Sequence, residues 1–383
     1  MQVAFHSQID DFKAEEWNRL VTDENPFLRY EFLSALEHND CVGERFGWQP
    51  QHLSVHDQGR LVGVSPLYLK DNSYGEFVFD HAWADAYRRS GLNYYPKLIS
   101  AAPYTPAYGN RLLVDPAVDK EQVQRVMIEA TLGLVKQLKL SSMHWLFTMP
   151  EEGETLKRMG MHERLGVQFH WSNPGYSDFD HFLSQLTAKR RKNIRHERRK
   201  VDQAGIRFRL VTGDQVSESE WALMTHFYSK TFEERYSLPT LNQGFFQEIG
   251  EKMGRQVVLV FAYDGSRCVA GAILYRSRSV LYGRHWGGLE HYDSLHFEAC
   301  YYQGIGYAIE QGLKRFEPGA QGEHKIWRGF MPTLTYSYHW IANPEFNIGI
   351  ERFLHQEAPA LLAYHKNLLE SSPYRQEAES VTN

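Results

Sequence analysis

Residues 257–276, VVLVFAYDGSRCVAGAILYR, predict two antiparallel strands joined by a tight turn. Asp-Gly between two apolar runs is a strong hairpin signal. Residues 53–69, LSVHDQGRLVGVSPLYL, follow the same plan much earlier in the chain. Both second strands place Arg, Val and Gly in the same order: Arg60, Val62 and Gly63, then Arg267, Val269 and Gly271. This repetition predicts an internal duplication, although two unrelated hairpins would also give so short a match.

The segments that follow each hairpin also correspond. After the first come a helix predicted over residues 119–140 and a strand-like MHWLFTM (143–149). After the second come a strand, SVLYGRHWGG (279–288), a helix predicted over residues 295–316 and a strand-like HKIWRGF (324–330). A repeated order of hairpin, helix and strand predicts an α/β (α+β) fold with mixed sheets flanked by helices.

A turn-rich segment, NPGYS (173–177), separates the two halves. With 383 residues the chain is long enough for two domains. We therefore predict domains at 1–176 and 177–383. Ser177 and Asp180 stand at capping-box spacing and predict a helix that continues to Gly205, a typical C′ residue.

Residues 189–200 within this helix carry eight Lys/Arg and one Glu, in a chain of formal net charge −5. A concentrated cationic edge on an acidic protein favours a partner with several negative charges, such as a diphosphate or an RNA backbone. Ile194 and Val201 are seven residues apart, which would keep one helix face packed. A simple solvated helix face is the alternative interpretation.

Composition excludes several classes. No stretch approaches the roughly 18 apolar residues of a membrane span, and the acidic N-terminus MQVAFHSQIDDF is unlike a secretory signal. We therefore expect a soluble, cytoplasmic protein without a membrane span. Cys41, Cys268 and Cys300 are far apart and form no CxxC pair, which argues against disulfides and a cysteine zinc site. His52 and His56 lie in an alternating segment, and no metal is expected.

The stretch LTAKRRKNIR (186–195) and the block from LYGRHWGG through LHFEACYYQ to HKIWRGFMPTLTYSYHW resemble the FemABX superfamily. The second block resembles more specifically its FemAB-like branch, labelled peptidoglycan biosynthesis or recognition. The resemblance implies two tandem acetyltransferase-like (GNAT) domains and N-acyltransferase activity. Its acceptor would be a phosphate-bearing molecule such as a peptidoglycan precursor.

The resemblance also implies roles for individual residues. Lys189, Arg191 and Arg195, with Asn193 in the same motif, would bind near a nucleotide-sugar diphosphate. Lys325 would lie at the acyl-transfer centre, although this chain reads Arg-Gly-Phe where the family motif ends differently. A long coiled-coil arm found in some family members is missing, which leaves tRNA binding open.

Acyl transfer to an amine needs positioning and charge stabilisation rather than a covalent enzyme intermediate. Lys325 and Arg328 are the candidate oxyanion-stabilising groups, but in an ideal strand they would point to opposite faces. His285, Glu298 and His296 flank the strand-to-helix turn of the second half and are candidate proton acceptors or caps. Further candidates for substrate binding are Arg284, Trp286 and His296.

The donor is expected to be an acyl-CoA, including acetyl-CoA, or an aminoacyl-tRNA. Gln303, Gly306 and Ala308 match the Q-x-x-G-x-A spacing of a coenzyme A cradle, but the match falls inside a predicted helix, where backbone N–H groups are already paired. A small-residue stripe (Gly304, Ala308, Gly312) that packs close to the sheet explains these residues better.

The Tyr/Pro-rich residues 93–111 predict a long ordered loop that either lines an acceptor groove or simply packs. Asp80, His81 and Asp85 could line the same groove. Two rival functions remain at this stage. One is a non-catalytic module of the same fold that binds a glycan precursor or nucleic acid. The other is an RNA-associated protein, against which no base-stacking aromatics interleave with the arginines.

Overall fold

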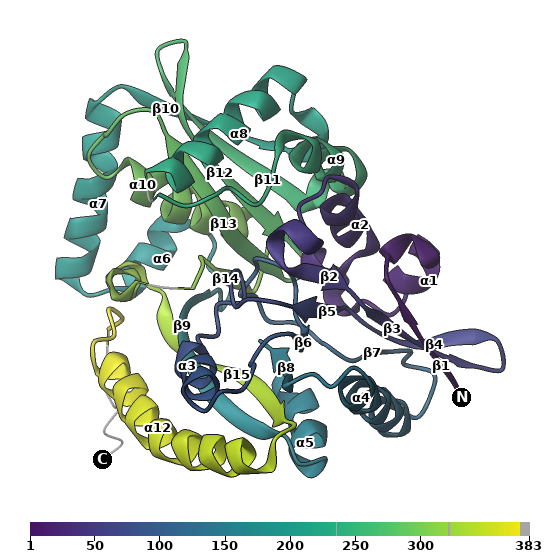
Figure 1. The fold of residues 1–383 in the computed structure, drawn as a ribbon. Coiled ribbons are helices and arrows are strands. Elements are labelled where there is room, and N and C mark those ends of the chain that lie inside the picture. The colour runs from purple at the N-terminus through teal and green to yellow at the C-terminus, as the bar shows by residue number, and fades with distance from the viewer. Residues whose placement is uncertain (235, 321, 376–383) are drawn as a thin grey trace. The chain divides into compact units, whose positions relative to one another are not determined.

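The computed structural model describes residues 1–234, 236–320 and 322–375, so the last residues of the predicted second domain lie outside it (Figure 1). The chain packs into two compact units, each built from separate segments. The first unit comprises residues 1–167, 239–254 and 334–363, and the second comprises 168–238, 255–333 and the described residues from 364 onward. The division into continuous domains at 176/177 stays a prediction.

The first unit contains two sheets, of strand orders β1-β3-β4-β7 and β15-β8-β6-β5-β2. Its strands are β1 (Gln2–His6), β2 (Trp48–Pro50), β3 (His52–Asp57), β4 (Arg60–Ser65), β5 (Leu67–Lys70), β6 (Lys97–Ser100), β7 (Leu113–Val114) and β8 (Ser142–Leu146). Its helices are α1 (Ala14–Asn18), α2 (Tyr30–His38), α3 (His81–Arg89), α4 (Lys120–Gln137), α5 (Pro150–Arg158) and α9 (Gln243–Met253). The chain passes between the units within β9 (His162–Ser172), β15 (Met331–Ile341) and α12 (Pro344–Glu370).

Helix α4 covers the β3–β4 hairpin and forms the core of the first unit. Asp119 caps the helix by accepting a hydrogen bond from the Gln122 N–H. Val123 and Met127 are fully buried, and a Cβ on Gly63 would lie 2.9 Å from Val123. Glycine in β4 therefore lets the helix approach the sheet closely.

Helix α9 belongs to the first unit although it follows the predicted domain boundary. Phe245 packs edge-on against Phe32 of α2, with ring centroids 5.5 Å apart. Glu248 of α9 accepts hydrogen bonds from Asn39 at 2.7 Å and pairs with His38 at 2.9 Å. These apolar and polar contacts explain why residues 239–254, although they are in the second half of the sequence, pack as part of the first unit.

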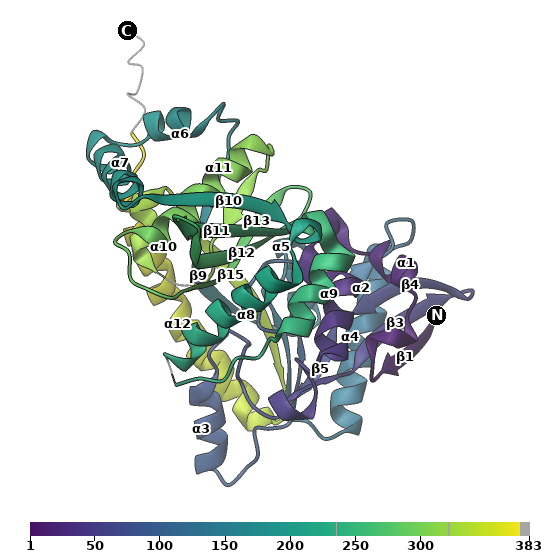
Figure 2. The same cartoon turned by 90° about the horizontal axis from the view of Figure 1, so that it is seen from above.

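The second unit is built on one sheet of order β10-β11-β12-β13-β14, with the end of β9 beside β14. Helix α8 packs on one face of this sheet and α11 on the other (Figure 2). The strands are β10 (Ile206–Thr212), β11 (Val257–Asp264), β12 (Arg267–Arg276), β13 (Val280–Gly288) and β14 (Arg315–Glu317). The helices are α6 (Phe179–Gln185), α7 (Ala188–Gln203), α8 (Glu218–Glu233), α10 (Leu295–Phe297), a π-helical segment (Glu298–Tyr302), α11 (Gln303–Glu310) and the 3₁₀ helix η8 (Glu323–Arg328).

Both predicted hairpins form, and both contain a β-bulge at the valine that the two sequences share. Each bulge lies in the strand that follows its turn, with Val62 as the extra residue in the first hairpin and Val269 in the second. Each hairpin is followed by two parallel strands connected through a helix, β6 and β8 in one unit and β13 and β14 in the other. The predicted mixed α/β class is therefore confirmed.

Two predicted elements near the C-terminus were wrong. The helix predicted to reach residue 316 ends at Glu310, because Gly312 adopts φ +65° and β14 begins at Arg315. The strand predicted for HKIWRGF is instead the 3₁₀ helix η8, between Gly322 at φ +114° and Gly329 at φ +97°. Positive φ at both flanking glycines closes a tight turn that a strand could not make.

The single helix predicted from residue 177 to Gly205 is also two helices. Leu186 and Thr187 have extended backbone angles, which separate α6 from α7. The α6 cap is Asp178, whose side chain accepts from the His181 N–H, rather than Ser177. Gly205 ends the helical stretch at φ +77°, as predicted, and Ile194 and Val201 of α7 are buried.

Candidate functional site

Strands β13 and β14 part soon after they meet, and this opening is the centre of the candidate site. They pair in parallel only over residues 280–282 and 315–317. β13 continues to Gly288 alongside β12, with a bulge at Arg284, which has no residue opposite it in the described register. Parting parallel strands and a bulge together leave backbone groups of β13 exposed to a ligand.

A pocket of about 520 Å³ lies where β13 ends and α10 begins. Trp286 and Gly288 of β13, the loop 289–294, and Lys230 and Thr231 of α8 contribute to its walls. The Thr231 hydroxyl donates to the Trp286 carbonyl at 2.8 Å, and Lys230 Nζ donates to the Leu289 carbonyl at 2.6 Å. These bonds fix the end of β13 against α8 and give the pocket a polar lining.

Lys325 and Arg328 lie on the same side of η8, because residues three apart eclipse each other in a 3₁₀ helix. The expectation that they point to opposite faces was wrong for that reason. Lys325 is 3% exposed, and its Nζ donates to the Gly319 carbonyl at 2.8 Å. Burial lowers the pKa of Lys325 to about 8.

Arg328 is held by Glu197, a residue that the sequence analysis did not select. The guanidinium donates to the two carboxylate oxygens at 2.6 and 3.2 Å, and the Tyr302 hydroxyl also donates to Glu197. The guanidinium lies 3.6 Å from the ring centre of Phe297, which lines the pocket. Glu197 is the single acid in the basic run, and that isolation was the signal for its pairing role.

The proposed proton acceptors fall in different environments. Glu298 accepts hydrogen bonds from Arg198 Nε at 3.1 Å and from Gln303 Nε2 at 2.8 Å, so it connects α7 to the π-helical segment within the second unit. Burial lowers the pKa of His285 to about 3. His296 lines the pocket, with its ring edge-on to Trp286 at 5.4 Å.

Arg284, at the bulge of β13, is a half-buried cation beside the opening. Burial lowers its pKa to about 10, while Tyr275 and Glu317 act in the opposite direction. Arg284 also influences the pKa of Lys325. The charge of Arg284 therefore acts on Lys325 and helps to lower its pKa. Lys325 is buried and Arg284 is half-buried.

The basic run of α7 divides into two groups. Arg191 donates to the Leu186 carbonyl at 2.6 Å and thereby caps the end of α6, and Arg195 lies 3.3 Å from Asp180. Lys200 pairs with Asp293 of the pocket loop at 2.6 Å. Lys189 and Asn193 are exposed on the outer face of the helix. Part of the run therefore holds the second unit together and part faces solvent.

The polar residues predicted to line a groove in the first half separate. Asp80 is buried and binds Lys97, whereas His81 is exposed and Asp85 pairs with Arg89 at 2.9 Å on α3. The segment predicted as a long loop includes β6. Cys41, Cys268 and Cys300 are free thiols.

Within the described ranges, no group of three or more His, Cys, Asp or Glu side chains is placed to hold a metal ion. No helix in the described part of the chain combines the length and the apolar character needed to cross a bilayer. The helix carrying Gln303, Gly306 and Ala308 continues directly from the π-helical segment, so their backbone N–H groups are not at a free N-terminus.

Comparisons with known proteins agree with this architecture. The FemAB-like family model, described as peptidoglycan biosynthesis/recognition, matches residues 8–376. The crystal structure of FemX is 12% identical, with a TM-score of 0.55 over 92% of this chain and 100% of that one. The C-terminal domain of a putative lysylphosphatidylglycerol synthetase from Agrobacterium fabrum is 9% identical, with a TM-score of 0.53 over 88% of this chain and 95% of that one. L-PGS from Bacillus licheniformis is 11% identical, with a TM-score of 0.51 over 85% of this chain and 96% of that one. None of the curated proteins matches the sequence.

Proposed function

The chain belongs to the FemAB-like family, and on that premise we propose that it is an N-acyltransferase acting on an amine of an anionic, phosphate-bearing acceptor. A peptidoglycan precursor is the acceptor class that the family description suggests. The observation that carries the proposal is the opening between β13 and β14, with two cations beside it: Lys325, which is buried, and Arg284, which is half-buried.

The reaction needs a neutral amine and an activated carbonyl. The amine nitrogen attacks the carbonyl carbon of a thioester or ester, and a C–N bond forms while the carbonyl oxygen becomes negative. The intermediate collapses, the C–S or C–O bond breaks, and the leaving group takes the electron pair as a thiolate or an alkoxide, which then gains a proton. The proton of the amine passes to a base. Hydrogen-bond donors held at the developing oxyanion give the largest rate gain in such reactions.

Lys325 is the proposed oxyanion donor. An ammonium has three N–H donors, and one is already fixed on the Gly319 carbonyl. With a pKa of about 8, most of the side chain is protonated near neutral pH. Because Gly319 orients it and burial lowers the local dielectric, its charge acts strongly on a nearby oxygen.

Arg328 is proposed as a positioning residue, since Glu197 already engages its guanidinium. His296 is the proposed proton acceptor because it lines the pocket. Glu298 is engaged by Arg198, and a pKa of about 3 makes the imidazole of His285 a weak base. Of the candidate catalytic residues, we therefore propose Lys325 as the oxyanion donor and His296 as the proton acceptor.

The exposed residues of α7, among them Lys189, Asn193 and Arg195, are proposed to bind the acceptor phosphates. The pocket, with Trp286 and His296 on its wall, is proposed to receive the donor. The donor is an acyl-CoA or an aminoacyl-tRNA. Both are cytoplasmic molecules, which is the basis for proposing a cytoplasmic enzyme.

The test is a mass-spectrometric transfer assay. Purified protein is incubated with labelled acyl-CoA or charged tRNA and a cell extract, and the small molecule that gains the label is identified. We expect Lys325→Gln to lower kcat about 100-fold with KM nearly unchanged. The control Lys120→Gln, an exposed residue of α4, should keep full turnover.

Two outcomes would oppose the proposal. Unchanged turnover of Lys325→Gln would remove that residue from the mechanism. Absence of transfer from every donor, with salt-sensitive binding of a glycan precursor or RNA, would identify a non-catalytic binding protein instead.

A further inference from the structure

We propose that the first unit binds a single long aliphatic chain in the groove between α3 and the first part of α12. The groove has a volume of about 350 Å³. Its walls are almost entirely apolar and include Ala82, Trp83 and Ala86 of α3, and Phe346, Gly349 and Phe353 of α12. This site is separate from the opening in the second unit, and its occupancy does not depend on the proposed acyl transfer.

Small residues and aromatic rings together line the groove. A Cβ on Gly349 would meet no atom within 4 Å, so the space above this helical position is open. Tyr87 packs against Phe346 with the two rings tilted and their centroids 3.9 Å apart, and Trp83 meets Phe353 edge-on at 6.5 Å. Residues 346 and 353 are seven positions apart, or about 10 Å along the helix.

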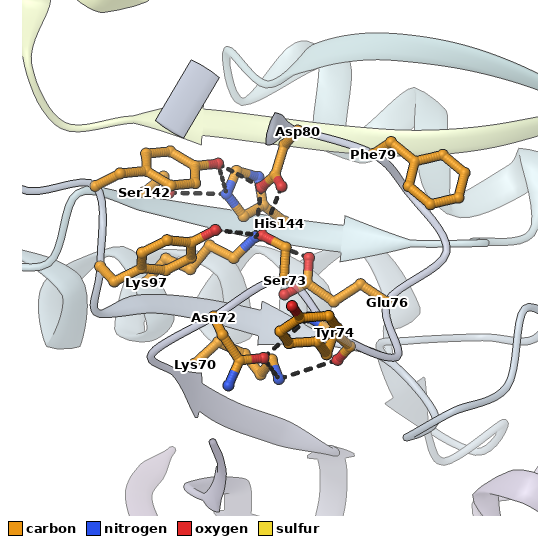
Figure 3. A network of polar contacts seen from close by, with 12 residues as sticks. Lys70, Asn72, Ser73, Tyr74, Glu76, Phe79, Asp80, Lys97, Ser142 and His144 are labelled. Carbon is orange, nitrogen blue, oxygen red and sulfur yellow. Dashed lines mark hydrogen bonds and ion pairs between the residues drawn. The ribbon is translucent and has the colours of Figure 1, made fainter. Parts of the chain in front are cut away.

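A loop of residues 71–80 presents further aromatic rings beside the start of α3 (Figure 3). Tyr74 is 80% exposed and Phe79 is 58% exposed. Phe77 is 40% exposed and adopts φ +60°, a conformation that costs energy for a bulky residue. Contiguous exposed apolar groups of this kind mark interaction sites rather than ordinary surface.

The loop is held in place by the buried side chain of Lys97 (Figure 3). Lys97 Nζ donates to Glu76 at 2.8 Å and to Ser73 at 3.1 Å, and it also binds Asp80. The Tyr94 hydroxyl donates to Asp80 at 2.6 Å. Three loop side chains are therefore drawn inward while the aromatic rings between them are held outward.

Arg164 joins the loop to the groove. Its Nη1 donates to the Phe79 carbonyl at 2.8 Å, and its guanidinium lies 5.1 Å from the Trp83 ring and 5.9 Å from the Phe353 ring. Glu357 of α12 holds the same guanidinium through two bonds of 2.8 Å. Arg164 therefore fixes the loop at Phe79 beside Trp83 and Phe353 of the groove.

An aliphatic chain fits this surface better than a bilayer or a protein. Helix α3 and residues 345–357 of α12 carry three Arg and four carboxylates, so the surface has no cationic excess to attract anionic lipid headgroups. A protein partner needs about 800 Å² of its own surface buried. The groove, with about 350 Å³, is instead near the lower limit of pockets for small ligands.

Trp83 also indicates what the chain carries. Its indole Nε1–H is buried without an acceptor among the described residues. Buried N–H groups nearly always have a partner. An oxygen on the ligand, such as that of an acyl ester or carboxylate, would supply it, so a long-chain acyl group is the chemical class that we infer.

The experiment uses the full chain and 11-(dansylamino)undecanoic acid below its micellar concentration, with dansyl fluorescence as the readout. Gly349→Leu should fill the groove and weaken binding at least tenfold. Gly133→Leu is the matched control, because Gly133 is an exposed glycine of helix α4 that also has open space around its Cβ. Both substitutions remove a helical glycine and should leave the fold intact.

Three results would overturn the proposal. The wild-type protein could fail to bind the monomeric probe. Gly349→Leu could bind as tightly as Gly133→Leu. Wild-type protein could sediment with phosphatidylglycerol vesicles or self-associate in ultracentrifugation while ignoring the probe, which would assign the surface to a bilayer or a second copy. Transfer activity is not needed for any of these readouts.

Discussion

Replacing Lys97 by methionine should destabilise the first unit strongly. Lys97 is fully buried, and Glu76 and Asp80, which it binds, are 3% exposed each. Methionine has a similar volume, so the substitution removes the charge without opening a large cavity. Breaking a buried ion pair by removing one partner costs about 3–5 kcal/mol, because the remaining charge is left without compensation. We expect a loss of this size at pH 8.

The loss should depend on pH with a defined sign. In the wild type, burial raises the pKa of Glu76 to about 7. Burial also acts to raise the pKa of Asp80, but Lys97, His144 and Ser73 together keep it below its usual value. Without Lys97 both carboxyls have folded-state pKa values above the unfolded values near 4. Such groups lose stability as pH rises. The deficit of Lys97→Met should therefore be larger at pH 8 than at pH 5.

Urea unfolding at the two pH values measures the deficit, and hydrogen exchange of β6 and β8 reports on the first unit by itself. Lys97→Met/Asp80→Asn, which removes one of the two uncompensated charges, should recover part of the loss. The surface control Lys120→Met should stay within about 0.5 kcal/mol of the wild type. A deficit below about 1 kcal/mol, or one that is the same at both pH values, would refute the reasoning.

Two further predictions concern packing and titration. Gly287→Ala should lower the free energy of unfolding in urea by more than about 3 kcal/mol or prevent folding, because the added Cβ would overlap the backbone of α8. Gly306→Ala has open space at the Cβ and should stabilise its helix by about 1 kcal/mol. Equal effects of the two substitutions would contradict this packing. His38 donates hydrogen bonds to the carboxylates of Asp10 and Glu248, and these bonds raise its pKa above the usual value. The stabilisation by His38 is therefore complete below pH 6.5 and is lost as pH rises through the raised pKa. The stability difference between the wild type and His38→Gln should therefore shrink from pH 6 to pH 8, and a constant difference would contradict the pairing.

The hairpins and the order of elements could be predicted because their signals are local. Asp-Gly and alternating apolar residues determine a hairpin within a few positions. The Arg, Val and Gly of the repeat are not equally spaced, because Gly63 directly follows Val62 whereas Gly271 is two residues after Val269. The structure shows the same bulge in both hairpins, at Val62 and Val269, so the pairing is more alike than the spacing suggested.

The elements that the sequence did not predict depend on tertiary contacts. Whether HKIWRGF forms a strand or a tight helix depends on the positive φ of Gly322 and Gly329, which apolar alternation does not report. Assignment of α9 to the first unit depends on Phe245 and Glu248 finding partners on α2. The role of Glu197 likewise required knowing that Arg328 would face α7.

Two buried lysines show how the related units differ chemically. Lys97 begins β6 and binds two carboxylates, which hold its pKa above the ordinary value despite burial. Lys325 donates to a neutral carbonyl, and burial lowers its pKa to about 8. A cation can stabilise an oxyanion only if its field is not already cancelled by fixed anions. We therefore assign the proposed chemistry to the second unit and a structural role to Lys97. Lys325→Gln should accordingly lower turnover far more than stability, whereas Lys97→Met should lower stability first.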